Sequence, residues 1–175
     1  MSTIKIENLS FSYYGYEKPI FENVLFSFDT NWKTGLIGRN GIGKSTLFKL
    51  LLNQEVYSGK ISKSVDFIKF PPNLSDTSKL GIELYKELIS DEEEWKLFRE
   101  LNLLNVDENL VYREFETLSK GEQTKILLAI LFTREDGFLL IDEPTNHLDM
   151  DGRKIVSEYL KNKKVFCLFL MIEIF

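Results

Sequence analysis

The sequence predicts an α/β protein with a mostly parallel sheet, an antiparallel strand region near the N-terminus and a helical insertion. Short apolar runs alternate with segments of helical period, which is typical of parallel strands joined by crossover helices. From about residue 73 to 117 the sequence becomes acidic and helical instead, after the break at Pro71-Pro72. A chain of 175 residues can form one domain with its own core.

Each expected element has its own pattern. Residues 3–13 alternate between apolar and polar and predict a strand, and residues 20–29 predict a second. Leucines spaced by three and four predict a helix over 44–53, and residues 58–70 predict a hairpin with its turn at Ser58-Gly59. The remaining expected elements are a short strand running through Leu36 and Ile37 into Gly38, a solvated helix start at Asp91–Glu94, helices at 120–134 and 151–162, a buried strand at 137–141 and a final strand at 165–170.

Composition excludes several classes of protein. With 43% apolar and 28% charged residues, the chain is neither disordered, collagen-like nor disulfide-stapled. The net charge of −5 argues against broad phosphate neutralisation on nucleic acid. One cysteine, Cys167, and one histidine, His147, argue against a disulfide and a histidine-rich metal centre, and we expect a cytoplasmic protein. The apolar run 165–172 is too short to span a bilayer, which takes about 20 residues.

The main chemical motif is the glycine-rich stretch GRNGIGKST at residues 38–46. Gly38, Gly43, Lys44 and Ser45 satisfy the phosphate-loop pattern G-x-x-x-x-G-K-[ST]. Glycines let backbone N–H groups surround phosphate oxygens, and the helix that follows directs its positive end at them. Lys44 would reach the β- and γ-phosphates, and the Ser45 hydroxyl would bind Mg²⁺. The alternative is a glycine-rich turn that binds nothing.

A second motif is the apolar run FLLI at residues 138–141, which is followed by Asp142 and Glu143. Acids at the carboxyl end of a buried strand lie where α/β sheets bind ligands. We expect Asp142 to bind Mg²⁺ and Glu143 to accept a proton from an attacking water. Many strands also end in a solvated acid. The functional interpretation of this motif therefore depends on the phosphate loop earlier in the same chain.

A third motif, LSKGEQ at residues 118–123, opens the helix expected at 120–134. Ser119 and Glu122 have the spacing of a capping box. A capped helix N-terminus with serine and glycine also suits an anion, so the structural and functional interpretations are compatible.

In chain order, the stretches at residues 38–46, 118–123 and 138–143 and the stretch NHLD at 146–149 resemble the Walker A, signature, Walker B and D-loop motifs of ABC-type ATPases. The spacing of the four stretches also resembles that family. The resemblance covers about residues 1–164 and implies a P-loop NTPase fold of the ABC type with ATP and Mg²⁺ as cofactors. It implies catalytic roles for Lys44 and Glu143, a metal site at Ser45 and Asp142, and nucleotide binding by Tyr13, Gly38, Asn40, Gly41, Gly43, Lys44, Ser45 and Thr46. It also implies that Ser119, Gly121, Glu122, Gln123 and the D-loop residue Asp149 act on the nucleotide of a second cassette.

Tyr13 corresponds to an aromatic residue that stacks on adenine in this family, although Tyr14 and Tyr16 are close rivals and a core position is the alternative. The runs EPTNHLD at 143–149 and SKGEQTK at 119–125 resemble the ABC-F subfamily, and within it the antibiotic-resistance, ribosome-protecting branch (Lsa/Vga-like). That resemblance implies a second cassette or a head-to-tail homodimer, a ribosome as partner of a full-length form, and no membrane insertion. The alternatives are the nucleotide-binding subunit of an ABC transporter and a nucleotide-binding module without turnover.

The sequence departs from the family at three places. Lys120 replaces the usual signature glycine, and no glutamine stands near Phe70-Pro71, where the Q-loop is expected. After residue 164 the family has a strand and then Ser-His-Asp-Arg, but here the sequence reads FLMIEIF at 169–175. One choice of synonymous codons for that stretch, read in a shifted frame, encodes Ser-His-Asp-Arg-Asp-Phe, so we expect a frameshift, with an unrelated short tail as the alternative. We therefore expect a single N-terminal-type cassette over 1–175, altered and truncated from about residue 165, without a second cassette or linker. Such a chain would bind ATP and hydrolyse it weakly.

Overall fold

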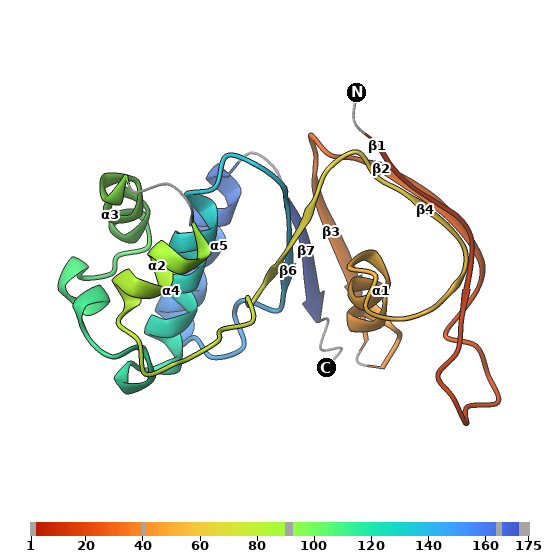
Figure 1. Cartoon of the computed structure of the whole chain (residues 1–175), viewed down its shortest axis with the longest axis horizontal. Helices are drawn as coiled ribbons and strands as arrows, with labels where there is room; N and C mark the ends of the chain where they lie inside the picture. The colour runs from red at the N-terminus through yellow and green to blue at the C-terminus, as the bar shows by residue number, and fades with distance from the viewer. Residues whose placement is uncertain (1–2, 40, 90–92, 164–165, 172–175) are drawn as a thin grey trace. The chain divides into compact units, whose positions relative to one another are not determined.

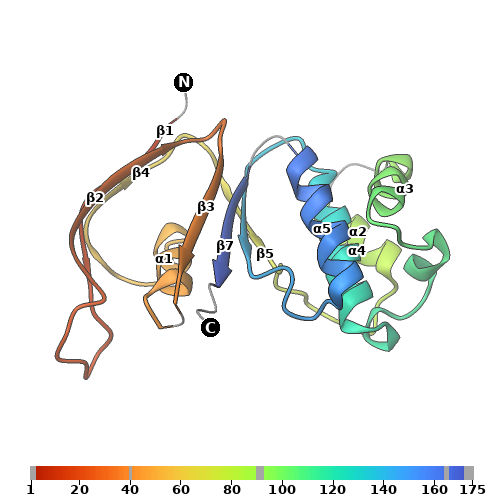
Figure 2. The same cartoon turned by 180° about the vertical axis from the view of Figure 1, so that it is seen from behind.

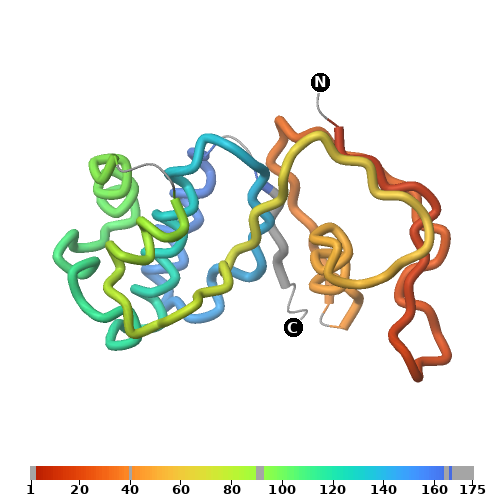
Figure 3. The backbone as a smooth tube through the Cα atoms, in the orientation of Figure 1, coloured from red at the N-terminus to blue at the C-terminus, as the bar shows by residue number. Residues whose placement is uncertain are grey.

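The computed structural model describes residues 3–39, 41–89, 93–163 and 166–171, and beyond Phe166 it describes the backbone alone. The chain forms two compact units (Figure 1). Unit 1 consists of Met1–Ile68, Gly137–Glu143 and Lys164–Phe175, and unit 2 consists of Lys69–Asp136 and Pro144–Lys163. The chain therefore passes from unit 1 into unit 2 and back twice, which the tube in Figure 3 traces.

Unit 1 contains the antiparallel strands expected near the N-terminus. Strand β1 (Thr3–Phe11) lies between β2 (Phe21–Asp29) and β4 (Ser58–Ser62), and both pairings are antiparallel. The apolar residues of β1 alternate into the core, where Ile4, Ile6 and Leu9 are fully buried.

The second sheet has the strand order β3-β7-β6-β5. Strands β3 (Lys33–Gly38) and β6 (Phe138–Asp142) each pair in parallel with β7 (Phe166–Met171), and β5 spans Phe67–Phe70. Helix α1 (Lys44–Leu51) follows β3 directly and lies beside it in Figure 2. Because β3 and β6 run parallel to the strand between them, their carboxyl ends lie at the same edge of the sheet.

Unit 2 is helical. It contains α2 (Gly81–Leu88), α3 (Glu94–Leu103), α4 (Lys120–Phe132) and α5 (Met150–Asn162), with two 3₁₀ segments at Glu108–Tyr112 and Phe115–Thr117. Helices α4 and α5 lie side by side in both views (Figures 1 and 2). The buried face of α3 repeats at three and four residues through Leu97, Leu101 and Leu104.

The predicted fold class is confirmed, including the parallel strands, the antiparallel region and the helical insertion. The predicted hairpin over 58–70 is wrong, because β4 pairs with β1 and β5 belongs to the other sheet. Gly59 is not a turn residue. Its φ is +103°, and a Cβ there would lie 2.6 Å from the Glu7 carbonyl oxygen, so glycine lets β4 approach β1 closely. Helix α1 ends at Leu51, two residues before the expected end.

Two expectations involve residues that the structure leaves out. Asp91 and Glu92 lie outside the described residues, and α3 begins at Glu94 with Glu93 as its N-cap. The expected final strand is present as β7. Residues 172–175 of the altered tail lie outside the described residues.

Candidate nucleotide-binding site

The phosphate loop connects the end of β3 to the start of α1 within unit 1. Gly41 and Gly43 have φ of +80° and +99°, a region that glycine enters without steric cost. A Cβ on Gly43 would lie 2.6 Å from Ile20 Cγ2, so the loop needs glycine here for space as well as for conformation. Asn40, the other predicted loop residue, lies outside the described residues.

Helix α1 offers its N-terminus to an anion. Its first intrahelical bond runs from the Leu47 N–H to the Gly43 carbonyl at 2.8 Å, so the preceding amides of the first turn have no partner in the helix. Gly43 is the N-cap, and among the described residues no side chain caps this end. An anion bound here would accept from these amides and meet the positive end of the helix.

Lys44 lies over the start of the loop. Its ammonium donates to the carbonyl oxygens of Gly38 at 2.6 Å and Arg39 at 2.9 Å. The charge of Lys44 is therefore held against the backbone at the start of the loop, and an anionic ligand would be a stronger acceptor for it than two neutral carbonyls.

Two predicted metal ligands meet in space although they are far apart in sequence. Ser45 Oγ donates to Asp142 Oδ2 at 3.3 Å, which joins the first turn of α1 to the end of β6. Among the described residues, no group of three or more histidine, cysteine, aspartate or glutamate side chains could hold a metal by itself. One hydroxyl and one carboxylate nevertheless suit Mg²⁺, which commonly combines one or two protein oxygens with waters and substrate phosphates. These residues therefore fit the expected ion.

Glu143, the predicted proton acceptor, follows directly after β6. Its φ is +43°, in the left-handed region that non-glycine residues seldom occupy. Such strain costs on the order of 1–3 kcal/mol and is concentrated at functional sites. Glu143 is half-buried and follows Asp142, so both carboxylates lie at the carboxyl end of β6.

Tyr13 is the tyrosine that contacts the phosphate-loop helix. Its hydroxyl lies 3.3 Å from Thr46 Oγ1, and the Lys49 ammonium lies 5.6 Å from its ring centroid. Its rivals Tyr14 and Tyr16 are exposed. Tyr13 also packs edge-on against the buried Phe11. It therefore contacts both the site helix, as predicted, and the core, which was the alternative. The sequence did not indicate Lys49.

The signature and D-loop residues lie together in unit 2. Ser119 is the N-cap of α4, and its hydroxyl accepts from the Glu122 N–H at 3.2 Å, while Glu122 Oε2 accepts from the Ser119 N–H at 2.8 Å. The predicted capping box is therefore confirmed. The Ser119 hydrogen bonds lower the pKa of Glu122 below its ordinary value. Asp149 is the N-cap of α5 and accepts from the Gly152 N–H at 2.7 Å.

Helix α4 contacts the D-loop at Gly121, where a Cβ would make ordinary van der Waals contacts. A Cβ on Gly121 would lie 3.4 Å from Leu148 Cδ2 and 3.5 Å from the His147 carbonyl oxygen. Gln123 is buried and donates through Nε2 to the carbonyls of Phe115 at 2.8 Å and Leu118 at 3.1 Å. The structure thus gathers the loop, the strand-end acids and Tyr13 in unit 1, and the signature and D-loop in unit 2.

Sequence reasoning missed a buried charged cluster between α3 and α5. Glu100 is 1% exposed and accepts hydrogen bonds from the Tyr159 hydroxyl at 2.6 Å and from the Lys163 ammonium. Burial and the nearby Glu100 charge raise the pKa of Tyr159, whereas burial lowers the pKa of Lys163 despite Glu100. A signal was present in the sequence, because Glu100 has the helical phase of Leu97 and Leu101.

Comparisons with known proteins agree with this geometry. The family described as "ABC transporter" matches residues 21–146, well over half of the chain. The chain is 32% identical over 154 residues to ABC transporter F family member 4 of Dictyostelium discoideum, and 31% identical over 155 residues to ABC transporter F family member 3 of Arabidopsis thaliana. These alignments cover 83% and 85% of this chain, which spans only 13% and 22% of the length of the two relatives.

A solved structure shows the same fold. It is an ABC transporter ATP-binding protein from Pyrococcus furiosus, with a TM-score of 0.80, 21% identity, and coverage of 99% of this chain and 93% of that one. Within the described residues, no helix is both long enough and apolar enough to cross a membrane. The chain belongs to the ABC transporter family as one of its ATP-binding cassettes.

Proposed function

We propose that this chain is an ABC-F-type cassette that binds ATP with Mg²⁺ at unit 1 and hydrolyses it in partnership with a second cassette. The observation that carries the proposal is the Ser45–Asp142 contact at the N-terminus of α1. It joins the two halves of the expected site at an uncapped helix end, beside the Lys44 ammonium.

Each site residue in unit 1 has its own role in this proposal. The first-turn amides of α1 bind the phosphates, and Lys44 moves from the carbonyls of Gly38 and Arg39 to the β- and γ-phosphates. Ser45 and Asp142 hold Mg²⁺, which neutralises charge on the phosphate oxygens.

The remaining tasks concern the attacking water and the base of the nucleotide. Glu143 orients the water and accepts its proton. Tyr13 presents its ring to the base and is steadied by Thr46 and Lys49.

The signature of unit 2 would act on the nucleotide of a second cassette. Ser119 and Gly121 stand at the N-terminus of α4, where an anion is favoured. Glu122 and Gln123 support this end by capping it and by binding the preceding loop. Asp149 fixes the D-loop through its cap on α5. The second cassette is either a distinct domain or another copy of this chain, arranged head to tail.

The ABC-F assignment is favoured over a transporter subunit by two relatives with F family names and by the EPTNHLD run. For a longer form of this protein, we propose cytoplasmic action on the ribosome with protection from antibiotics, as the resemblance to that branch implies. A nucleotide-binding subunit of a transporter remains the second candidate, since the matched family includes such subunits.

Thermal unfolding with and without Mg-ATP tests the binding step. At a ligand concentration 100 times Kd, the folded state gains about 2.7 kcal/mol, which should raise Tm by roughly 5–10 °C in a chain of this size. Lys44→Ala should abolish the shift, whereas Lys18→Ala, which removes an exposed lysine outside the loop, should keep it. A cooperative wild-type transition that ATP leaves unmoved would contradict the proposal.

Phosphate release tests the hydrolysis step separately. Glu143→Gln should bind Mg-ATP as wild type does and should slow turnover by about 10²–10⁴-fold, the usual contribution of a general base. Equal rates for wild type and variant would leave a binding module without enzymatic activity. Sedimentation of a longer form that carries Glu143→Gln with ribosomes, with and without ATP, separates the ABC-F proposal from the transporter alternative.

A further inference from the structure

Helices α4 and α5 of unit 2 carry the two motifs proposed to act on a second cassette. Ser119 is the N-cap of α4 and Asp149 is the N-cap of α5, and the two helices lie side by side (Figures 1 and 2). Their starts meet where a Cβ on Gly121 would lie 3.4 Å from Leu148 Cδ2. An apolar contact of this kind brings two helices together but has no direction, so their relative register depends on directional bonds elsewhere.

The D-loop is bonded to the first turn of α5. Asp149 Oδ1 accepts from the Gly152 N–H at 2.7 Å, and the Asp149 carbonyl accepts from the Arg153 N–H at 2.9 Å. Arg153 Nε donates to the Leu148 carbonyl at 3.0 Å. A helix of 13 residues is a stiff rod of about 20 Å. A shift or rotation of α5 therefore moves Asp149 with it.

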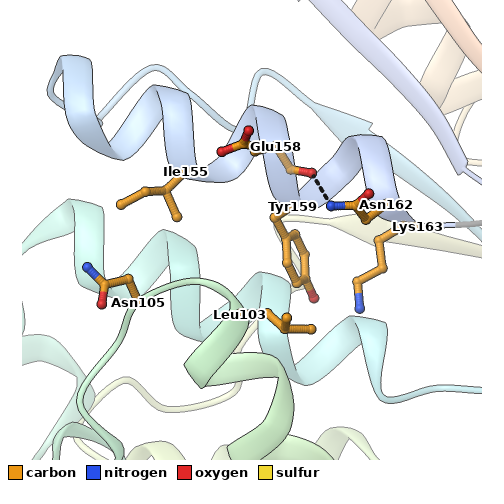
Figure 4. A pocket seen from close by; sticks show the side chains of 7 residues that line it. All are labelled: Leu103, Asn105, Ile155, Glu158, Tyr159, Asn162 and Lys163. Atoms are coloured by element: carbon orange, nitrogen blue, oxygen red, sulfur yellow. Dashed lines mark hydrogen bonds between the residues drawn. The ribbon is translucent and has the colours of Figure 1, made fainter.

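The other end of α5 is bound to a single buried acid of α3. The Tyr159 hydroxyl and the Lys163 ammonium both donate to the Glu100 carboxylate. Figure 4 shows these two side chains extending from α5 with their polar ends converging, beside a groove of about 500 Å³. Phe132, at the end of α4, packs edge-on against the Tyr159 ring with 5.3 Å between centroids. We call Glu100, Tyr159, Lys163 and Phe132 the clamp.

The clamp determines the register of α5. Its two donors, Tyr159 and Lys163, stand one helical turn apart and meet the same carboxylate, so sliding or rotating α5 breaks at least one of the bonds to Glu100. A buried ionic cluster adds little stability over well-packed apolar side chains, and the specification of register is its best-attested use. Because the clamp spans α3, α4 and α5, it holds the ends of these helices in one arrangement.

We propose that Glu100 is a positioning residue for the D-loop. By fixing α5 against α3 and α4, Glu100 determines where Asp149 lies, relative to Ser119, when unit 2 meets the nucleotide of a second cassette. This role rests on the proposed action of the D-loop on that nucleotide. All residues of the clamp belong to unit 2, so Mg-ATP binding at unit 1 is expected to be independent of it.

Hydrogen exchange of the full 175-residue chain, followed by mass spectrometry well below the Tm of every variant, tests the link between the clamp and the D-loop. Glu100→Gln keeps the side-chain length and removes the charge, and Tyr159→Phe removes a single donor. Both should speed exchange in the D-loop segment 145–153 roughly five- to thirtyfold, the factor expected from one or two lost hydrogen bonds. Segment 41–51 of unit 1 should exchange as in wild type.

Lys96→Met is the matched control. Lys96 is also a charged residue of α3, but it pairs with Glu93 at 2.9 Å and Glu135 at 3.1 Å. Its loss should leave exchange in 145–153 unchanged. The proposal would be overturned by faster exchange confined to α3 and the end of α5, by an equal effect of Lys96→Met, or by an equal acceleration in unit 1. In each case Glu100 would hold the helices together without placing the D-loop.

Phosphate release by mixed copies tests the action on a second cassette. Glu100→Gln should bind Mg-ATP with the wild-type Kd and release phosphate roughly 10- to 100-fold more slowly, because small misplacements are costly in catalysis. Added Glu143→Gln copies, whose D-loop is intact, should raise phosphate release above that of either variant alone. No such rise, with active wild-type copies, would overturn the proposal. A wild type that binds Mg-ATP without turnover would instead contradict the proposed hydrolysis, and hydrogen exchange alone would then decide the positioning role.

Discussion

The buried cluster of Glu100, Tyr159 and Lys163 gives a prediction in which three substitutions cost less than one. Glu100→Met removes a carboxylate that is 1% exposed and leaves three donors behind, of which Arg99 is more than half exposed. The Tyr159 hydroxyl then has lost its acceptor in a buried position, at a cost of about 1–3 kcal/mol. Lys163 loses its counter-charge, although 16% of its side chain is exposed and water can reach it in part. Breaking a buried ion pair from one side typically costs about 3–5 kcal/mol, and we expect this single variant in that range.

The triple variant Glu100→Met, Tyr159→Phe, Lys163→Met removes the carboxylate together with its two less exposed donors, and the remaining partner Arg99 is 56% exposed and reaches water. Each new side chain is apolar and of similar length, so no hydroxyl or ammonium of the cluster is left unsatisfied. Replacing a buried ionic cluster by well-packed apolar residues is often close to neutral. We therefore expect the triple variant to be more stable than the single variant, by about 2 kcal/mol or more.

Guanidinium chloride unfolding provides the assay, with the midpoint compared at an unchanged m-value. In a chain of this length, about 1 kcal/mol shifts Tm by roughly 2–4 °C, so the single variant should melt on the order of 10 °C below wild type. A loss below about 1 kcal/mol for Glu100→Met, or a triple variant no more stable than the single one, would refute the reasoning. The first result would mean that α3 and α5 are held mainly by their apolar contacts, and the second that the apolar replacements do not pack well enough to offset the lost cluster.

Three further predictions concern capping, pH and the phosphate loop. Ser119→Ala removes the cap of α4 and should cost about 1 kcal/mol, measured by denaturant unfolding, whereas Ser119→Asp should retain most of it. Because the pKa of Glu122 is lower in the folded chain than its ordinary 4.5, its stabilisation is present above that value and disappears as pH falls through the folded pKa. The stability difference between wild type and Glu122→Gln should therefore be largest near neutral pH and shrink as pH falls below 4.5 and through the lower folded pKa. Gly43→Ala places a Cβ against Ile20 at φ +99° and should abolish the Mg-ATP shift in Tm, while Gly15→Ala, at φ +84° but with open space around it, should keep the shift.

The sequence predicted best what depends on local spacing. The phosphate loop, the capping box and the acids at the end of β6 each lie within a few residues, and local backbone rules determine their geometry. Strand pairing is a long-range property, so the same alternation that located β4 and β5 could not tell that they belong to different sheets.

The buried cluster was missed because charge usually marks a solvated face. Glu100 follows the acidic run at 91–94 and resembles its continuation in composition. Its helical phase places it between Leu97 and Leu101 on the buried face, and its partners Tyr159 and Lys163 come from a helix some sixty residues away. Phase indicates that a charge is buried, but only the folded chain shows what neutralises it.

Lys120 belongs to the signature motif and also affects the electrostatics of α4. It is the first residue of the helix, where a positive charge opposes the helix dipole by about 0.3–1 kcal/mol. Gln123 Oε1 accepts from the Lys120 ammonium at 3.0 Å, and the amide nitrogen of Gln123 is already engaged with two carbonyls. The lysine charge is therefore held at the positive end of the helix, where it is destabilising unless an anion binds beside it.

Lys120→Gln keeps helix propensity and removes the charge. It should leave the free chain equally or slightly more stable in denaturant unfolding, and it should weaken any Mg-ATP-dependent pairing of two cassettes measured by light scattering. Pairing unaffected by this change would show that the signature does not meet the partner's phosphate through Lys120.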